Sequence, residues 1–305
     1  MSTTTSVDPV RVAAPPTTAP PVKPAPVRRW PSLFSKHTNI PGGLGGALWL
    51  IIVVIPLYWV LTTSFRSSTT FFSDAPLSLP SEPTLGNYAK VFDSGFFGYF
   101  TNSVIVTIAA VIIAVFVSLL AAYTIARNTH VVSRTAFSLV LLGLAVPLQA
   151  AIIPIFYMLS QLGLYDTLLA LIIPSAAFAI PITVVILVNF LRDIPGELFE
   201  SMRLEGATDW MMLWKLVLPL SRPALITVGI YNALGVWNGF LFPLVLTQSP
   251  SVRVLPLALW SFQSELTVDV PGIMAAVVMS MIPILTLYIF GRRQLVAGLT
   301  AGFGK

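Results

Sequence analysis

The sequence predicts an all-α integral membrane protein with six membrane-spanning helices. Hydrophobic residues occupy 56% of the 305 positions and charged residues only 10%. The apolar residues gather into six runs, each long enough to cross a bilayer, which takes ~20 residues of helix. The runs lack the alternation of a barrel strand, and a helix satisfies its own backbone hydrogen bonds in lipid. Helical spans are therefore expected.

Each predicted span consists mostly of Leu, Ile, Val, Ala and Phe. In chain order the spans cover residues 46–65, 101–126, 136–159, 168–191, 223–247 and 272–291. Prolines recur within or beside them, and each interior proline removes a backbone hydrogen bond and permits a kink or break. These prolines are Pro56, Pro147, Pro154, Pro174, Pro181, Pro243 and Pro283.

The basic residues predict the orientation of the spans. If the N-terminus is cytoplasmic, 14 of the 17 Lys and Arg residues lie in cytoplasmic segments, and only Arg66, Lys90 and Arg253 lie outside. This distribution obeys the positive-inside rule, so both termini are expected in the cytoplasm. The net charge of +5 then reflects membrane topology, and no nucleic-acid partner is implied.

Residues 1–45 differ in composition from the rest of the chain. They contain nine prolines among Thr, Ser and Ala, a composition typical of a disordered tail, here expected in the cytoplasm. The first apolar run begins only near residue 46 and has full spanning length, so a retained helix is expected rather than a cleaved signal peptide. Residues 46–305 form the predicted transmembrane domain.

The residues within the spans disfavour several function classes. None of the six runs contains Asp, Glu, Lys, Arg or His, which argues against a self-contained proton-driven carrier, although ion coupling through backbone carbonyls stays open. The two histidines, His37 and His130, lie in the tail and in a short loop, and the chain has no cysteine. No catalytic residue and no metal site is therefore expected.

A charged segment, residues 195–222, separates the fourth and fifth spans. Pro195 can start a short helix with Glu200 near its N-terminal end, and Gly206 suits the left-handed turn that ends a helix. Thr208 or Asp209 can cap a second helix. That helix carries one apolar stripe, formed by Leu213, Leu216, Val217 and Leu220. The segment is either an ordinary interfacial hairpin or an elbow that docks a soluble partner.

The residues of this elbow resemble a known family. Glu200-Ser201-Met202, Gly206-Ala207 and Leu218-Pro219 are similar to the cytoplasmic loop of the permease subunits of bacterial ABC importers, with Ser201-Met202 in place of the usual Ala-Ala. Four further stretches resemble the second, six-span subunit of the maltose-type carbohydrate importers. These are residues 162–167, 190–195, 237–238 and 298–302, and the resemblance covers residues 46–305.

The resemblance implies partners and roles. The partners would be a second homologous permease subunit, two cytoplasmic ATPase subunits, an extracytoplasmic sugar-binding protein and the bilayer of the bacterial cell membrane. ATP and Mg²⁺ would bind to the ATPase subunits, so this chain would be no enzyme and would bind no cofactor. Within the C-terminal tail, 292–305, the segment 298–305 would reach between the ATPase subunits. The expected coupling residues are Glu200, Ser201, Met202, Glu205, Gly206, Ala207, Leu218 and Pro219.

The implied substrate is a di- or oligosaccharide. Candidate pathway residues are Trp237, which can stack on a sugar ring, and Asn238 and Gln149, which can bond hydroxyl groups. The alternatives are an importer for glycerol phosphate, an amino acid or a peptide, a secondary carrier, and a structural or regulatory membrane subunit. An exporter half would carry its own phosphate-binding loop, and the glycine-rich C-terminus ends at Lys305 without the Ser or Thr that such a loop needs.

Overall fold

The computed structural model describes residues 40–128, 130–259 and 268–301. The predicted N-terminal tail as far as residue 39, and the last four residues of the predicted C-terminal tail, lie outside these ranges. The chain divides into two compact units, Met1–Ile51 and Ile52–Lys305. All features described below belong to the second unit, apart from the first part of the first helix.

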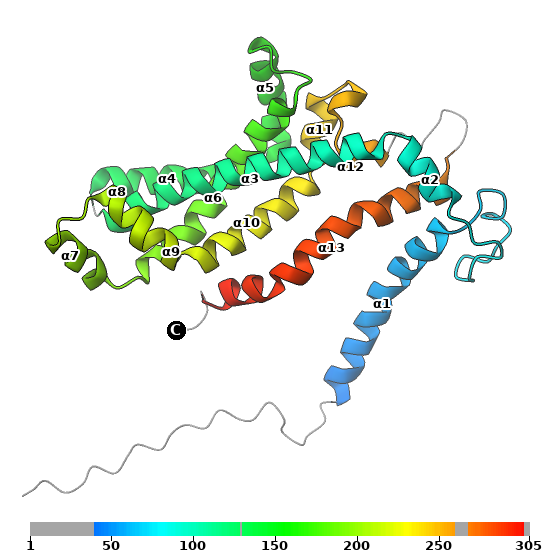
Figure 1. Cartoon of the computed structure of the whole chain (residues 1–305), viewed down its shortest axis with the longest axis horizontal. Helices are drawn as coiled ribbons and strands as arrows, with labels where there is room; N and C mark the ends of the chain where they lie inside the picture. The colour runs from blue at the N-terminus through cyan, green and yellow to red at the C-terminus, as the bar shows by residue number, and fades with distance from the viewer. Residues whose placement is uncertain (1–39, 129, 260–267, 302–305) are drawn as a thin grey trace, which may run out of the picture. The chain divides into compact units, whose positions relative to one another are not determined.

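The described residues are predominantly helical (Figure 1). The elements are α1 Ile40–Ser64, α2 Gly86–Asp93, α3 Phe96–Arg127, α4 Val131–Leu144, α5 Leu148–Gln161, α6 Leu168–Arg192, α7 Gly196–Leu204, α8 Asp209–Met212, the π-helical η1 Leu213–Val217, α9 Leu218–Leu220, α10 Arg222–Trp237, α11 Leu241–Leu246, the 3₁₀ turn η2 Pro250–Val252, α12 Leu255–Ala258 and α13 Val270–Ala301.

Four of the described helices are long and apolar enough to cross a membrane: α1, α3, α6 and α13. Two bent pairs also qualify when each pair is taken as one span, which brings the number to as many as six. The pairs are Val131–Leu144 with Leu148–Gln161, and Asp209–Leu220 with Arg222–Trp237. The all-α membrane architecture predicted from the sequence is therefore confirmed, with four to six membrane helices. The sixth helix is longer than predicted, because α13 continues past residue 291 to Ala301.

The prediction of one continuous helix at 136–159 is wrong. The structure has two helices there, α4 and α5, whose axes differ in direction by 102°. The break falls at Pro147, which is the N-cap residue of α5. A proline disfavours helical geometry at the residue before it and donates no backbone hydrogen bond, so the ladder of α4 cannot pass through it.

The helix predicted at 223–247 is also interrupted. It consists of α10 and α11, separated by Asn238, Gly239 and Phe240. Asn238 ends α10, and its side-chain Nδ2 donates to the Leu234 carbonyl at 2.8 Å. A Cβ atom at Gly239 would lie 3.0 Å from the Val236 carbonyl oxygen, so the turn favours glycine. The Asn-Gly pair is a turn signal that the predicted continuous span did not take into account.

The centre of the fold is the pair α3 and α6, which pack against each other (Figure 1). Small residues recur every fourth position on the buried face of α3, at Ala110, Ala114, Ser118 and Ala122, and all four have 0% exposure. Such a row lets two helix backbones approach closely, which is how helices commonly associate in membranes. The Ser118 hydroxyl also donates to the Ile180 carbonyl of α6 at 3.4 Å.

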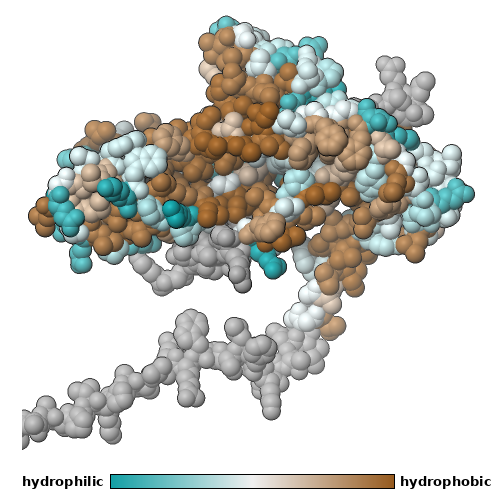
Figure 2. Space-filling model, viewed as in Figure 1, coloured by the Kyte–Doolittle hydropathy of each residue, from teal (hydrophilic) through white to brown (hydrophobic). Residues whose placement is uncertain are grey.

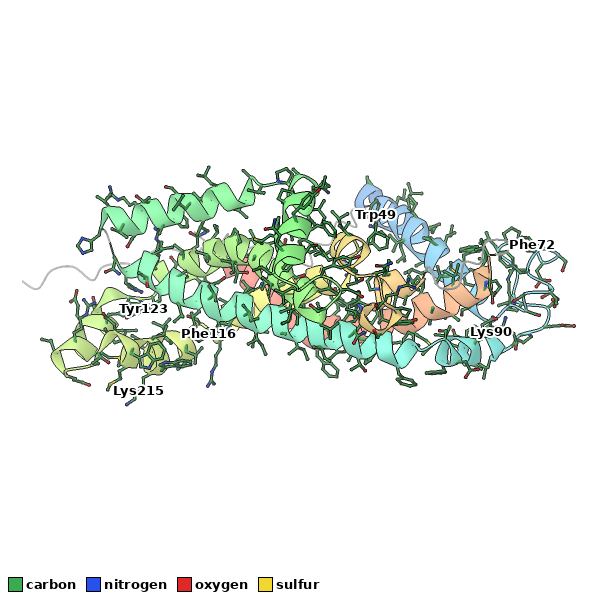
Figure 3. All side chains as sticks on the ribbon, turned by 90° about the horizontal axis from the view of Figure 1, so that it is seen from above. Trp49, Phe72, Lys90, Phe116, Tyr123 and Lys215 are labelled. Atoms are coloured by element: carbon green, nitrogen blue, oxygen red, sulfur yellow. The ribbon has the colours of Figure 1, made fainter. Side chains whose placement is uncertain are left out.

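The fold has two ends along α3. Tyr123 and Lys215 lie at one end, beside α7, and Lys90 and Phe72 lie at the other, beside α2 (Figure 3). We call these the α7 end, with residues 123–128, 130–134 and 191–222, and the α2 end, with residues 65–95, 247–255 and 268–272. Hydrophobic residues cover much of the surface between them, and hydrophilic residues gather toward the two ends (Figure 2).

Candidate functional site

The hairpin at the α7 end has the local geometry that its sequence predicts. Pro195 is the N-cap residue of α7, and Gly206 has a φ of 80°, in the left-handed region. The Ala207 N–H donates to the Met202 carbonyl at 2.9 Å and closes the turn. The cap of the second helix is Thr208, whose hydroxyl accepts from the Met211 N–H at 3.2 Å. The hairpin is therefore ordered by its own backbone.

Most of α7 is exposed. Glu200, Ser201 and Glu205 are exposed, and Leu204 is 91% exposed. Met202 instead is half-buried and packs against the hydrophobic cluster shared by α3, α6 and the hairpin. Phe199, 5% exposed, is the one buried residue of α7. The helix thus presents a mixed acidic and apolar surface while a single ring anchors it from beneath.

The anchor of α7 is an arginine that the sequence reasoning counted only as a basic residue for topology. Arg127 ends α3, and its Nη2 donates to the Leu191 carbonyl at 2.6 Å and the Ile194 carbonyl at 2.9 Å. Its guanidinium carbon lies 3.8 Å from the centre of the Phe199 ring, which also stacks on Tyr123 at 6.4 Å. Arg127 therefore joins α3, the end of α6 and α7.

The second arm of the hairpin runs through α8, η1 and α9. Leu213 and Val217 are buried and Leu216 is half-buried, as predicted, but Leu220 is 43% exposed. The prediction of a stripe of four was wrong at this position because η1 is a π-helix, whose wider turn rotates the residues that follow it. Met212, 1% exposed, completes the buried face instead.

A sharp bend connects this arm to α10. The helical stretches 209–220 and 222–237 differ in direction by 74°, and the bend falls at Ser221. Leu218 is half-buried against the cluster, and Pro219 is exposed. The predicted coupling residues therefore all lie on one hairpin. Their role in coupling stays a prediction.

A cavity of about 620 Å³ lies among α3, α6, α10 and α11. Its described lining contains no Asp, Glu, Lys, Arg or His, and combines apolar side chains with hydroxyl and amide groups. The polar and aromatic lining residues include Ser103, Thr107, Ser175, Phe178, Tyr231, Asn232, Trp237 and Asn238. Such a cavity suits a neutral solute that offers hydroxyl groups.

Two of the three predicted pathway residues line this cavity. Asn238 is exposed toward it, whereas Trp237 is only 9% exposed and meets the Phe100 ring edge-to-face at 5.9 Å. Gln149 is exposed on α5 and does not belong to the lining. Contact of any of the three with a solute stays a prediction.

Sequence reasoning missed several lining residues, among them Thr107 and Tyr231. Thr107 is 8% exposed, and its hydroxyl has no hydrogen-bond partner among the described residues. Tyr231 is 55% exposed on α10. The signal for Thr107 was its spacing, since Ser103 and Thr107 are four residues apart and share one helix face. Asn232, by contrast, makes an interhelical bond, donating from Nδ2 to the Thr183 hydroxyl at 2.8 Å.

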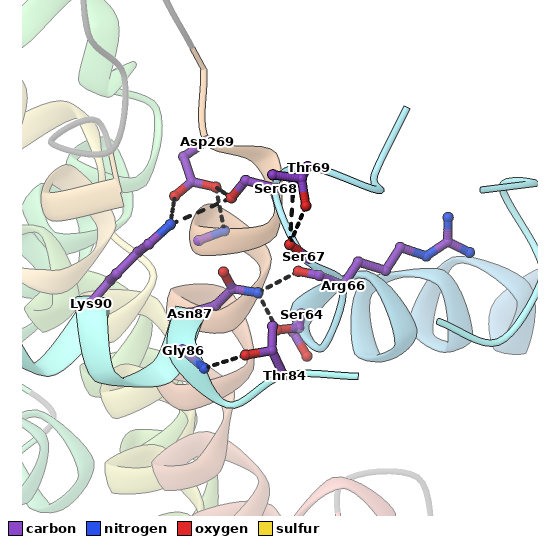
Figure 4. Close-up of polar contacts among 11 residues, drawn as sticks. Ser64, Arg66, Ser67, Ser68, Thr69, Thr84, Gly86, Asn87, Lys90 and Asp269 are labelled. Carbon is purple, nitrogen blue, oxygen red and sulfur yellow. Dashed lines mark hydrogen bonds and ion pairs between the residues drawn. The ribbon is translucent and has the colours of Figure 1, made fainter. Parts of the chain in front are cut away.

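The α2 end is held by side chains that bond distant segments (Figure 4). The Asn87 Nδ2 donates to the Ser64 carbonyl at 2.9 Å and the Arg66 carbonyl at 2.7 Å. Lys90 pairs with Asp269 at 3.0 Å, and the Ser68 hydroxyl donates to the same carboxylate at 3.1 Å. Burial raises the pKa of Asp269, but the bonds from Lys90, the Gly272 N–H and Ser68 outweigh it, so the net shift is downward.

Asp166 makes a similar link between two loops. Its carboxylate accepts from the Gln248 N–H at 2.7 Å, the Ser249 N–H at 2.9 Å and the Ser249 hydroxyl. These bonds lower the pKa of Asp166 below its ordinary value, and the bond from the Gln248 N–H has the largest effect. The residue has a φ of 57°, which is rare outside glycine. The loop before α6 is therefore fixed to the segment after α11.

Comparison with known sequences gives a consistent result. Residues 114–300 match the family described as binding-protein-dependent transport system inner membrane component. The chain is 40% identical over 259 residues to a putative ABC transporter permease of Caldicellulosiruptor sp. (strain Rt8B.4), covering 85% of this chain and 94% of the relative. It is 34% identical to the diacetylchitobiose uptake permease NgcG of Streptomyces coelicolor, covering 84% of this chain and 85% of the relative.

A solved structure has the same fold. A chain from the crystal structure of a bacterial ABC transporter involved in the import of the acidic polysaccharide alginate superimposes with a TM-score of 0.73 at 22% identity. The match covers 85% of this chain and 98% of that one. The overall helical arrangement of Figure 1 is thus one that a chain of a solved ABC transporter also adopts.

Proposed function

This chain belongs to the family of binding-protein-dependent transport system inner membrane components, and we propose that it is the six-span permease subunit of an ABC importer for a di- or oligosaccharide. The observation that carries the substrate class is the uncharged cavity lined by hydroxyl, amide and aromatic side chains. Relatives whose names state the uptake of saccharides support the same class.

We place the α7 end in the cytoplasm, with both termini on that side. Six described basic residues lie at this end, and three lie at the α2 end. The six are Arg127, Arg134, Arg192, Arg203, Lys215 and Arg222, and the three are Arg66, Lys90 and Arg253. This asymmetry follows the positive-inside rule. We count α4 with α5 as one span and α10 with α11 as another, which gives six.

The hairpin of α7 and α8 is proposed as the contact with a separate ATPase subunit, which binds ATP and Mg²⁺ itself. Glu200 and Leu204 supply an exposed acidic and an exposed apolar group, and Gly206 sets the turn between the arms. A movement of α7 reaches the bundle through Phe199 and Arg127, because these two side chains connect α7 to α3 and α6. A second permease subunit and a sugar-binding protein complete the proposed assembly.

The cavity is proposed as this subunit's share of the sugar pathway. A saccharide offers hydroxyl groups to Thr107 and Asn238 and an apolar ring face to Tyr231. The volume of the cavity, about 620 Å³, lies within the range of small-molecule sites, roughly 300 to 1,000 Å³. An amino acid or a phosphate ester would require a charged partner, and the described lining supplies none. Importers of those solutes remain the alternative.

The test uses the assembled complex in lipid nanodiscs with its binding protein. A panel of mono- and oligosaccharides, amino acids and glycerol phosphate is assayed for stimulation of ATP hydrolysis. We expect stimulation by one oligosaccharide or a small group of them, and stimulation by an amino acid or a phosphate ester alone would overturn the substrate class.

A threonine variant then tests the cavity. Thr107→Val removes one buried hydroxyl without changing the shape of the side chain, so we expect the concentration of sugar-loaded binding protein that gives half-maximal uptake to rise about threefold to tenfold. Thr124→Val is the matched control, because Thr124 lies on the same helix and its hydroxyl donates to the Leu120 carbonyl of its own helix. Equal effects of both substitutions would remove Thr107 from the pathway.

A further inference from the structure

A second cavity, about 420 Å³ in volume, lies at the α7 end between the last turn of α3, the first turns of α4 and the last residue of α6. It shares no lining residue with the cavity among α3, α6, α10 and α11. Its lining is basic and polar over an apolar floor and contains no acidic residue. The residues are Ile125, Ala126, Asn128, Ser133, Arg134, Phe137, Ser138 and Arg192.

The two arginines of this cavity, both exposed, differ in their partners from Arg66, Arg127 and Arg203. Arg66 and Arg127 bond backbone carbonyl groups, and Arg203 pairs with Asp209. The guanidinium groups of Arg134 and Arg192 form neither an ion pair nor a hydrogen bond with any described residue. Arg192 only lies over the Phe137 ring, at 5.6 Å from its centre. Two positive charges therefore face one cavity without a counter-charge from its lining.

Neutral hydrogen-bond donors accompany these charges. Ser133 and Ser138 line the cavity, and within the described chain their hydroxyls are not engaged with other groups. Ser133 lies in the first turn of α4, where the helix N-terminus adds a partial positive charge. Guanidinium and hydroxyl donors together form the donor set that binds phosphate oxygens well, because the bonds are charge-assisted.

The position of the cavity identifies the source of the phosphate. The membrane spans α3 and α6 end at Arg127 and Arg192, so the cavity lies where the hydrocarbon region meets the head groups. Val131, Val132, Leu139 and Leu142 of α4 are 62–79% exposed and offer an apolar surface beside it. Basic pockets between membrane helices are typical sites for anionic lipid head groups.

We propose that this cavity binds the phosphate of an anionic phospholipid between Arg134 and Arg192, with the acyl chains along α4. The site depends only on the membrane location of the chain. It is independent of which solute is carried, so a failed sugar assay leaves it standing. It places a lipid beside Arg127, at the joint of the proposed coupling hairpin.

The test measures lipid that stays with the purified complex. The complex is extracted in mild detergent from cells that contain phosphatidylglycerol, and bound lipid is counted by native mass spectrometry. The double variant Arg134→Gln with Arg192→Gln is expected to retain roughly tenfold less phosphatidylglycerol. The charge-matched control, Arg292→Gln with Arg293→Gln in the C-terminal half of α13, should retain within about twofold of the parent amount.

Two further measurements distinguish loss of charge from misfolding, and a lipid from free phosphate. Arg134→Lys with Arg192→Lys keeps both charges and should retain most of the lipid if the Gln variant fails through lost charge. Delipidated complex should gain thermal stability from added phosphatidylglycerol but not from millimolar inorganic phosphate. Retention of lipid by the Gln variant at the parent level overturns the site, and displacement of the lipid by inorganic phosphate overturns the lipid as its ligand.

Discussion

The α2 end and the α7 end of the bundle are held together in different ways. At the α2 end, side chains bond to segments far away in sequence: Asn102 donates to the Ser251 and Arg253 carbonyls at 2.8 and 2.9 Å, and Lys90 pairs with Asp269. At the α7 end, the hairpin is closed by bonds among its own neighbours. Its first arm, α7, is joined to the bundle chiefly through Arg127 and Phe199, and its second arm through buried apolar side chains such as Met212 and Val217.

The difference indicates which end is built to move as a unit. Several independent bonds at the α2 end must break before one loop shifts relative to another. Helix α7 itself has one buried ring, with one arginine beneath it, so a partner that moves α7 acts on few contacts. This contrast makes four predictions, from the largest expected effect to the smallest.

The largest effect is expected at the joint of the α7 end. Arg127→Met removes two charge-assisted bonds to carbonyls and the contact with the Phe199 ring, a loss of roughly 3–5 kcal/mol in the attachment of α7. Sugar uptake by the reconstituted complex should fall at least about tenfold. Arg203→Met, the same change at an exposed pair on α7, should stay within about twofold. Normal uptake by an assembled Arg127→Met complex would contradict the proposed joint.

A smaller effect is expected at Asp166. Asp166→Ala removes three bonds and places alanine at a positive φ, and should destabilise the complex by about 1–3 kcal/mol, measured by thermal unfolding. Asp166→Asn should lose less, because asparagine tolerates this backbone conformation and still accepts hydrogen bonds. Asp93→Ala, at an exposed position of α2, is the matched control. An unfolding temperature equal to that of the control would show that these loops are not held by Asp166.

The third prediction concerns pH. The folded pKa of Asp166 lies below its unfolded value of about 3.9, so its contribution to stability is fully present above about pH 4 and is lost as pH falls through the folded pKa. Between pH 5 and pH 3, the parent complex should therefore lose more stability than Asp166→Asn, measured by thermal unfolding. Parallel curves for the two proteins would argue against the shift.

The smallest effect is expected at the ion pair of the α2 end. Lys90 and Asp269 have partly exposed side chains, 54% and 27%, and such pairs contribute little. Lys90→Met should cost at most about 1 kcal/mol and leave uptake near the parent level. A large loss of uptake would show that this pair has a role beyond stability, for example in contact with the binding protein.

The long spans were predictable because length and composition suffice for them. The predicted span 168–191 differs from α6 by one residue, and Gly206 was correctly assigned to a left-handed turn. The breaks were not predictable from proline alone. Pro147 separates α4 from α5, whereas Pro174 and Pro181 lie inside an unbroken α6. Packing against α3 supports α6 around its prolines, and that support comes from tertiary structure.

The candidate site divides in the same way. The hairpin residues were found because turn and cap residues act over a few neighbours. Arg127 and Asp166 were not assigned their structural roles, because their partners lie 64 and 82 residues away in the chain. The lining of the cavity likewise depends on which faces of α3, α6 and α10 meet. Trp237 and Asn238 were predicted because they are polar residues in an apolar span and fit the family resemblance.

The row of small residues on α3 has a mechanical consequence. Because Ala110, Ala114, Ser118 and Ala122 let α3 and α6 lie in close contact, the two helices resist bending as one rod. Arg127 stands at one end of this rod and Asn102 near the other, 25 residues apart, which at 1.5 Å per residue is about 38 Å. If α7 couples as proposed, a displacement applied beneath it would pass along this rod to the segment after α11, which Asn102 holds through the Ser251 and Arg253 carbonyls.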